Sequence, residues 1–226
     1  MIRIYCKNSL EKRLSMTGDN FHYLSKVMRI KKGFSVLIFN QNDGEFLYKI
    51  SEIYKKEIVL TRKSKNKDSF ILPQLELAFA PIRKNRLSFL IEKATELGAT
   101  KLHPVLTDHT QYRELNLERL EKITIEATEQ CGRFSPPEIS PILSFDEFLK
   151  LGKFFIYLNE KRDENTPLIS KELLKNQVVL VGPEGGFSEA ELEMLSNDKK
   201  AIPTSLGKLI LRTETAGIKA LSVLNS

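Results

Sequence analysis

The chain has 226 residues and a hydrophobic fraction of 41%, which fits one large domain or two small ones with packed cores. It contains no apolar run near the roughly 20 residues that cross a bilayer, and its N-terminus lacks the charged-then-apolar pattern of a secretory signal. Cys6 and Cys131 have neither a zinc spacing nor a disulfide framework, so we expect a cytoplasmic protein without membrane or metal partners.

The positive charge is concentrated in the first third of the chain. Residues 1–72 contain 15 Lys and Arg against 7 Asp and Glu, whereas residues 73–226 contain 20 against 22. Such a basic field attracts polyanions, of which nucleic acid is the most obvious. A surface that is merely rich in lysine is the alternative, and the charge alone favours RNA or DNA binding only slightly over it.

Residues 1–62 contain short segments rich in β-branched and aromatic residues, which predict strands at Ile2–Cys6, Ser35–Asn40, Glu45–Ser51 and Ile58–Arg62. Asn42-Asp43-Gly44 predicts a tight hairpin, and Asn20–Met28 a short helix. Closely spaced small strands are typical of a compact barrel. The polar stretch Lys63–Ser69 predicts a linker, so we place one domain at residues 1–68 and another at residues 73–226.

From Leu75 onward, predicted strands and helices alternate. The strands are Leu75–Ala80, Lys101–Leu106, Phe154–Leu158, Val178–Val181 and Ala201–Thr204, and the helices are Lys84–Leu97, Asn116–Gln130, one that begins at the capping box Ser188–Glu191, and Thr213–Leu224. This alternation indicates an α/β domain with a mostly parallel sheet covered on both faces. Ligands of such sheets bind at the carboxyl ends of the strands.

Two glycine-containing segments follow predicted strands at these ends, Val181–Ser188 and Ser205–Ala216. Glycine lets main-chain amide and carbonyl groups approach a ligand closely because it has no Cβ atom. The sequence lacks the glycine patterns of P-loop, dinucleotide-binding and serine hydrolase sites. The two segments therefore predict a pocket with main-chain walls, whose charged members are Glu184, Arg212 and Glu214.

These residues resemble the RsmE family of ribosomal RNA methyltransferases, within the SPOUT superfamily. The resemblance extends over essentially the whole chain. Its most specific motifs are Gly182–Phe187 and Leu206–Ala216 as a pair, and weaker ones are His22 with Val27-Met28-Arg29 and Gly33, Lys93–Gly98 and Glu126–Arg133. The family usually has leucine at the position of Met28, and it often has a serine-arginine pattern where this chain has Thr107–Thr110.

The resemblance implies a PUA-like β-barrel for RNA, followed by a methyltransferase domain with a deep trefoil knot. It also implies S-adenosylmethionine (SAM) as cofactor, methylation of N3 of a uridine in small-subunit (16S) ribosomal RNA, the small ribosomal subunit as partner, and a homodimer with the site near the subunit interface. The cofactor-binding residues expected on this basis are Leu158, Val181, Gly182, Pro183, Glu184, Gly185, Gly186, Ser205, Leu206, Gly207, Leu209, Ile210, Leu211 and Thr213.

Arg212 is the first candidate for catalysis, because a guanidinium stays charged in proteins and stabilises charge that develops on the uracil oxygens. Uridine N3 must lose its proton before it attacks a methyl group, and Glu184 and Glu214 are the candidate acceptors. A turn-stabilising role for Glu184 is about equally compatible with the sequence. Glu214 lies in the first turn of a predicted helix, where the helix dipole favours any carboxylate.

Several cations are candidates for contact with RNA phosphates: Arg29 and Lys31 in the barrel, Arg83, Lys84 and Arg86 after the first strand of the second domain, and Arg133. A solvated helix start is the alternative for Arg83, Lys84 and Arg86, and a helix C-terminal cation is the alternative for Arg133. His22 is expected to be structural. Phosphate contacts of this kind give affinity and salt dependence rather than sequence choice.

Two other functions remain open from the sequence. One is a methyltransferase of the same fold that acts on tRNA or on another RNA base. The other is a non-catalytic RNA-binding factor in ribosome assembly, against which the presence of Glu184, Arg212 and both glycine segments weighs.

Overall fold

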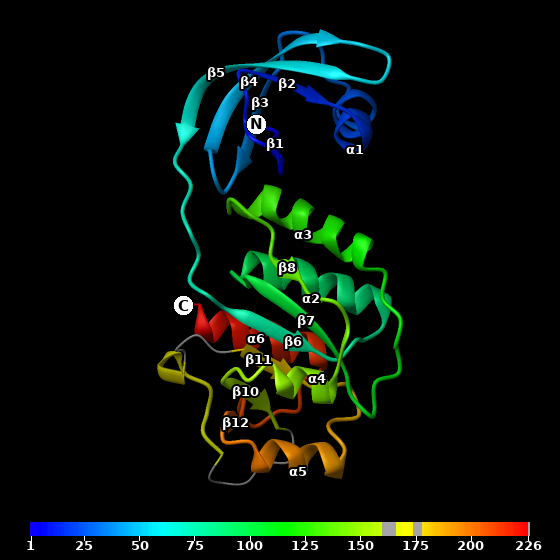
Figure 1. Cartoon of the computed structure of the whole chain (residues 1–226), viewed down its shortest axis with the longest axis vertical. Coiled ribbons are helices and arrows are strands. Elements are labelled where there is room, and N and C mark those ends of the chain that lie inside the picture. The colour runs from blue at the N-terminus through cyan, green and yellow to red at the C-terminus, as the bar shows by residue number, and fades with distance from the viewer. Residues whose placement is uncertain (160–165, 174–177, 226) are drawn as a thin grey trace. The chain divides into compact units, whose positions relative to one another are not determined.

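The chain forms two compact units in the computed structural model, which describes residues 1–159, 166–173 and 178–225 (Figure 1). The first unit comprises Met1–Ile71 together with Thr128–Ser135, and the second comprises Leu72–Ala127 with Pro136–Ser226. None of the described helices has the length and apolar character needed to cross a bilayer.

A five-stranded sheet with the order β1-β3-β4-β5-β2 forms the first unit. β1 pairs with β3 in parallel, and the other neighbours are antiparallel. One face packs a core that includes Ile4, Ile38, Tyr48 and Ile50. The strands are β1 (Arg3–Tyr5), β2 (Arg13–Met16), β3 (Ser35–Asn40), β4 (Gly44–Ile53) and β5 (Ile58–Lys67). The four predicted strands and the predicted hairpin are confirmed, whereas the sequence prediction missed β2.

Two local expectations in this unit need correction. The predicted linker Lys63–Ser69 is wrong over most of its length, because β5 continues to Lys67 and pairs with β4 through Lys65 and Lys67. An exposed strand end carries the same polar residues as a linker, so polarity alone does not separate them. The predicted helix at 20–28 lies slightly earlier, as α1 (Gly18–His22), and continues as a π-helical turn at Tyr23–Val27.

The segment Thr128–Ser135 belongs to the first unit because specific bonds hold it there. The guanidinium of Arg3 donates to the carbonyl oxygens of Thr128 and Arg133 at 2.9 and 2.8 Å, and it also pairs with Glu45. The main-chain amide of Tyr5 donates to Oε1 of Glu129 at 2.9 Å. The sequence pattern gives no sign of this return to the first unit.

A mostly parallel sheet with the order β12-β10-β11-β6-β7-β8 forms the second unit, and β9 pairs with β7. Among the described residues its strand pairings are parallel. Its strands are β6 (Glu76–Phe79), β7 (Lys101–Leu106), β8 (Glu138–Ile139), β9 (Leu143–Ser144), β10 (Phe155–Leu158), β11 (Val178–Val181) and β12 (Ala201–Thr204). The five predicted strands are confirmed, and only the two-residue strands β8 and β9 were not expected.

The helices of this unit begin where the sequence places capping residues. Asn116 Oδ1 accepts the amide of Arg119 at 2.9 Å, and Ser188 and Glu191 form the predicted capping box. Gly98, with φ +87°, ends the first long helix in the left-handed region that favours glycine. The helices are α2 (Lys84–Glu96), α3 (Leu117–Cys131), α4 (Phe145–Lys150), α5 (Glu189–Asn197) and α6 (Thr213–Leu224), of which only α4 was not predicted.

Successive residues of the central strands alternate between two hydrophobic cores. Leu77 and Val181 belong to a core that α2 and α6 complete, whereas Ala78 and Leu180 belong to a second core with residues of α4 and α5. Because both faces are covered, the central strands are apolar at nearly every position, which is why the sequence identifies them so clearly. The carboxyl ends of β10, β11 and β12 remain for a binding site.

A buried ion cluster lies at the opposite ends of the strands, where Glu76 begins β6. Its carboxylate is 2.7 Å from His103 Nε2 and 2.6 Å from Lys153 Nζ, and the amide of Gln74 donates to it at 2.6 Å. Burial acts to raise the pKa of Glu76, but the bonds from His103, Lys153 and Gln74 outweigh it and lower that pKa to about 2. A carboxyl group whose pKa is lower in the folded than in the unfolded protein stabilises the folded state at pH values above its unfolded pKa of about 4.3. This stabilisation is lost as the pH falls toward about 2.

We therefore expect Glu76→Gln to lower the free energy of unfolding by about 2 kcal/mol at pH 7. The difference from the wild-type protein narrows as the pH falls below about 4, because the wild-type carboxylate then loses its advantage. Urea unfolding between pH 7 and pH 3 measures both effects. If the difference in unfolding free energy between Glu76→Gln and the wild type did not change with pH, the lowered pKa of Glu76 would be contradicted.

Candidate cofactor-binding and catalytic site

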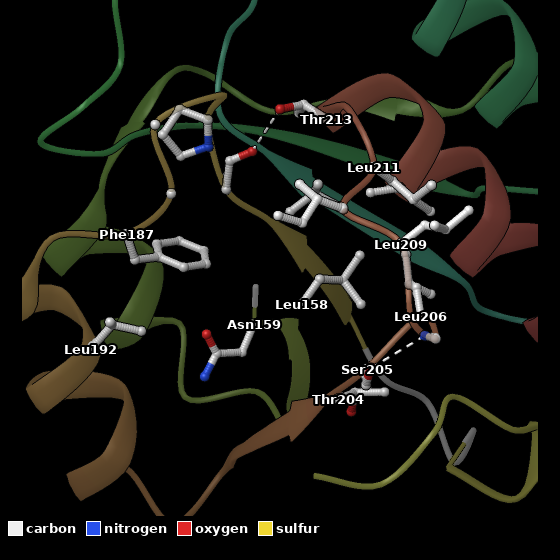
Figure 2. Close-up of a pocket in the computed structure, with 18 residues that line it drawn as sticks. Leu158, Asn159, Phe187, Leu192, Thr204, Ser205, Leu206, Leu209, Leu211 and Thr213 are labelled. Carbon is white, nitrogen blue, oxygen red and sulfur yellow. Dashed lines mark hydrogen bonds between the residues drawn. The ribbon is translucent and has the colours of Figure 1, made fainter. Parts of the chain in front are cut away.

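A pocket with a volume of about 810 Å³, including its open mouth, lies at the carboxyl ends of β10, β11 and β12 (Figure 2). Two loops form most of it: the first glycine loop, Gly182–Phe187, follows β11, and the second glycine loop, Ser205–Arg212, follows β12. The lining residues are Leu158, Asn159, Val181, Gly182, Pro183, Gly185, Gly186, Phe187, Leu192, Thr204, Ser205, Leu206, Gly207, Leu209, Ile210, Leu211, Thr213 and Ala216.

The structure brings together all the residues predicted to bind the cofactor, with one exception. Glu184 is absent from the lining of this pocket and instead lines a neighbouring hollow. Arg212 does not line the pocket either; it is exposed and occupies the N-cap position of α6, where its side chain makes no capping bond. The sequence reasoning missed Asn159, Phe187, Leu192, Thr204 and Ala216. Of these, Asn159 carried a usable signal, since it is a polar residue directly after a buried strand.

Packing around its own aromatic residue determines the shape of the first glycine loop. A Cβ atom on Gly182 would lie 3.1 Å from the ring of Phe187, so a side chain at this position would displace the ring. Gly186 has φ +69°, and its amide closes a turn onto the carbonyl of Pro183 at 3.0 Å. Thr213 Oγ1, from the start of α6, donates to the carbonyl of Gly182 at 3.0 Å (Figure 2). The loop is therefore fastened to α6.

The second glycine loop presents apolar side chains at the mouth of the pocket. Leu209 and Ile210 are 76% and 78% exposed, which is unusual for residues of this size. Gly207 has φ +103°, and Lys219 Nζ holds the loop by donating to the carbonyl of Leu206 at 2.8 Å. Figure 2 shows Leu206, Leu209 and Leu211 along this loop, with Leu158 beside them. An apolar or aromatic ligand would cover these groups from water.

Arg86 connects the two carboxylates that the sequence suggested as proton acceptors. Its Nη1 pairs with Oε1 of Glu184, and its Nε lies 3.7 Å from Oε1 of Glu214. Glu214 is only 8% exposed, and its Oε2 has no hydrogen-bond partner among the described residues. Arg86 therefore neutralises a buried carboxylate and fixes the first glycine loop to α2 and α6.

The segment Thr107–Thr110 clasps the first glycine loop from its outer side. Asp108 Oδ2 accepts from Ser188 Oγ at 2.6 Å, and His109 Nδ1 lies 3.1 and 3.0 Å from the carbonyl oxygens of Gly185 and Gly186. Both oxygens are acceptors, so Nδ1 carries the proton in these bonds. No role was predicted for His109, because its partners lie more than 70 residues away along the chain.

Replacement of His109 tests whether this clasp holds the loop for the cofactor. His109→Ala removes the donor, and we expect it to weaken SAM binding about fivefold to tenfold, as for the loss of one hydrogen bond. His109→Asn keeps an amide donor near the same carbonyls and should bind SAM within about threefold of the wild type. Titration calorimetry measures both, with exposed Arg113→Ala as the matched control. Equal affinity of the alanine variant and the wild type would contradict the clasp.

The predicted RNA-contacting cations fall into three groups. Arg29, Lys31, Arg83 and Lys84 are exposed, and the first turn of α2 contains no acidic residue beside Arg83 and Lys84. Arg86 is engaged by carboxylates. Arg133 is only 4% exposed, and burial lowers its pKa to about 10, so its buried guanidinium is poorly placed for a phosphate. The described residues contain no cluster of His, Cys, Asp and Glu arranged as metal ligands.

Comparison with known proteins identifies the family. Residues 71–225 match the RNA methyltransferase domain, and residues 16–61 match the RNA methyltransferase PUA domain. The chain is 39% identical to ribosomal RNA small subunit methyltransferase E of Rickettsia conorii, over 97% of this chain and 93% of that protein. The chain belongs to the ribosomal RNA small subunit methyltransferase E family. The enzyme of the same name from Synechocystis is 31% identical over 96% of this chain and 74% of its own length.

Solved structures agree with the fold of this methyltransferase E family member. A Legionella pneumophila protein, described as a methyltransferase in complex with the cofactor SAM, has 29% identity and a TM-score of 0.87, covering 99% of this chain and 96% of that one. The Neisseria gonorrhoeae methyltransferase E bound to SAM has 24% identity and a TM-score of 0.83, covering 98% and 96%. The predicted mixed α/β fold with a mostly parallel sheet and the predicted PUA domain are confirmed.

Proposed function

We propose that this protein transfers the methyl group of SAM to N3 of a uridine in small-subunit (16S) ribosomal RNA. The pocket built by the two glycine loops carries the proposal, in a chain that is 39% identical to a ribosomal RNA small subunit methyltransferase E. The SAM-bound Legionella protein, at 29% identity, supports the choice of cofactor. The exposed cations of the PUA-containing unit support an RNA substrate.

The residues of the pocket fit an adenosyl ligand. The lining of the pocket is mostly apolar with a few main-chain polar groups, as is usual for sites that hold such molecules. The amide of Gly185 and the carbonyl of Gly207 can approach the polar edge of an adenine closely, because neither residue has a Cβ atom. Leu158, Leu209 and the other apolar lining residues can cover its faces. We propose that the predicted cofactor-binding residues other than Glu184 form this site.

The proposed chemistry is an in-line displacement that the protein promotes by positioning and charge. SAM, when bound, supplies an electrophilic methyl group on a positively charged sulfur. Arg212 is exposed at the start of α6, and we assign it the stabilisation of negative charge on the uracil oxygens as N3 loses its proton. Glu184 is assigned as the proton acceptor; its carboxylate is 43% exposed, and Arg86 orients it through Oε1.

The remaining features of the proposal concern assembly and location. They are a trefoil knot in residues 73–226, a homodimer with the site near the subunit interface, action in the cytoplasm, and the small ribosomal subunit as partner. The name of the family supports the small ribosomal subunit as partner, and the other three features rest on the resemblance to the RsmE family. Arg29, Lys31, Arg83 and Lys84 are the cations proposed to contact RNA phosphates.

A transfer assay with purified components tests the function. The protein is incubated with SAM and, in separate reactions, with naked 16S ribosomal RNA, small ribosomal subunits and tRNA. We expect 3-methyluridine in one of the first two reactions and none in tRNA. Methylation of tRNA or of a different base would replace the proposed substrate, and SAM binding without any transfer would refute the proposed activity.

A further inference from the structure

A surface groove in the second unit begins beside the first glycine loop and extends to α3. With the solvent space at their mouths included, its inner part has a volume of about 230 Å³ and its outer part about 580 Å³. Ile82 and Tyr112 line both parts, and Pro183 and Gly185 line both the inner part and the cofactor pocket. The first glycine loop therefore borders both the groove and the cofactor pocket. We name this groove the Tyr112 groove.

An apolar floor and an aromatic wall form the interior of the Tyr112 groove. Ile82, Leu87 and Leu120 are 3%, 3% and 2% exposed and belong to the core under α2, so the floor is rigid. Tyr112, which lines the same groove, is 42% exposed. An exposed ring beside an apolar floor offers a stacking surface to a planar group, such as a nucleic acid base.

The outer part of the groove has more positive than negative side chains. Lys84 and Arg119 line it, against Glu114 as its acidic residue. Arg119 is held in place, since its Nη2 donates to Ser88 Oγ at 2.9 Å. The positive end of the α2 dipole lies here too, without an acidic residue in the first turn. Cations at the rim of an aromatic-lined groove suit a phosphate that is joined to a stacked base.

We propose that the Tyr112 groove binds the RNA nucleotide next to the target uridine, with its base stacked on Tyr112 and its phosphate at Lys84 and Arg119. This inference rests on the proposed function, because it takes the target base to sit at the cofactor pocket. The adjoining nucleotide must then lie close by, and the groove shares the first glycine loop with the cofactor pocket. Gln111 lines the inner part and is exposed, so its amide can donate to and accept from the edge of that base.

Replacement of Tyr112 gives the first test. Tyr112→Ala is expected to raise the KM for an RNA fragment with the target uridine about tenfold or more, within the range measured for loss of one aromatic–base stack. Tyr112→Phe keeps the ring and should stay within about twofold of the wild type. Phe89→Ala, which removes an exposed aromatic side chain of α2 outside the groove, is the matched control. Calorimetry should give an unchanged SAM dissociation constant for all three variants, which also verifies that they fold.

A double-mutant cycle identifies the stacked base directly. The nucleotide on either side of the target uridine is replaced in turn by an abasic one, and KM is measured with wild type and Tyr112→Ala. At the stacked position, the abasic RNA should raise the KM of the wild type by about the same factor as Tyr112→Ala does with intact RNA. In the Tyr112→Ala variant the abasic RNA should raise KM hardly any further. Lys84→Glu should also raise KM. Its affinity for RNA should fall less steeply with rising salt concentration than that of the wild type, because one phosphate contact is lost.

The outcomes separate this inference from the proposed function. Absence of rRNA methylation by the wild type would refute the function itself. Suppose instead that the wild type methylates rRNA normally. Equal KM values for Tyr112→Ala and Phe89→Ala, or additive effects on KM at both abasic positions, would then overturn only the proposal for the Tyr112 groove. A changed sedimentation coefficient of Tyr112→Ala with an unchanged KM would assign the groove to a second copy of the chain and would equally overturn it.

Discussion

Arg212→Ala is expected to lower the single-turnover rate of uridine methylation about a hundredfold or more, while the affinity for SAM stays within about twofold. The guanidinium is exposed at the end of the second glycine loop and does not line the cofactor pocket, so its loss leaves the walls of that pocket intact. It removes the fixed positive charge proposed to face the uracil oxygens. Rapid-quench kinetics with saturating RNA and SAM measure the rate, and calorimetry measures the affinity.

Lys208→Ala is the matched control for Arg212, because Lys208 is an exposed cation of the same loop. It should reduce the rate by no more than about threefold, as for a general contribution of surface charge. Equal losses in the two variants would mean that the net charge of the loop, rather than Arg212 itself, promotes the reaction. An unchanged rate in Arg212→Ala would remove this residue from the mechanism.

Arg86→Met is the second change with a large expected effect. It leaves the buried carboxylate of Glu214 without its cation and releases Glu184 and the first glycine loop. Breaking a buried ion pair from one side costs about 3–5 kcal/mol, and the 3.7 Å separation from Glu214 and the one-third exposure of Arg86 reduce this to about 2 kcal/mol. Urea unfolding at pH 7 measures the stability, and calorimetry should record weaker SAM binding.

A double variant separates the structural role of Arg86 from its role at the site. Adding Glu214→Gln to Arg86→Met removes the unpaired buried charge, so it should restore much of the lost stability. Methylation should remain low, because Glu184 still lacks the partner that orients it. If the double variant were as unstable as Arg86→Met alone, the contact between Arg86 and Glu214 would not be a source of stability. Full recovery of activity would contradict the role given to Arg86.

Much of the fold follows from local patterns that the sequence displays. β11 and β12 were predicted at their observed bounds, and for β11 the reason is plain, because four apolar residues followed by glycine are distinctive. α6 was predicted to the residue from its apolar spacing after Arg212. The cofactor pocket could be anticipated for the same reason, since the carboxyl ends of parallel strands gather at one edge of the sheet.

Features that depend on distant residues could not be predicted in the same way. His109 contacts Gly185 and Gly186 because β7 and β11 both adjoin β6 in the sheet, and the strand order is not encoded locally. Arg86 resembled a solvated cation in the sequence, yet it pairs with two carboxylates more than 90 residues away. Arg133 was predicted to contact RNA, with a helix-end cation as the alternative, but it is buried.

The nucleosides of small-subunit ribosomal RNA from cells that lack this protein test the central claim most directly. Mass spectrometry should find that a single 3-methyluridine is lost, that the wild-type gene restores it, and that a gene for the Arg212→Ala variant does not. An unchanged content of 3-methyluridine, or loss of a different modified nucleoside, would contradict the assignment of the two glycine loops to uridine methylation.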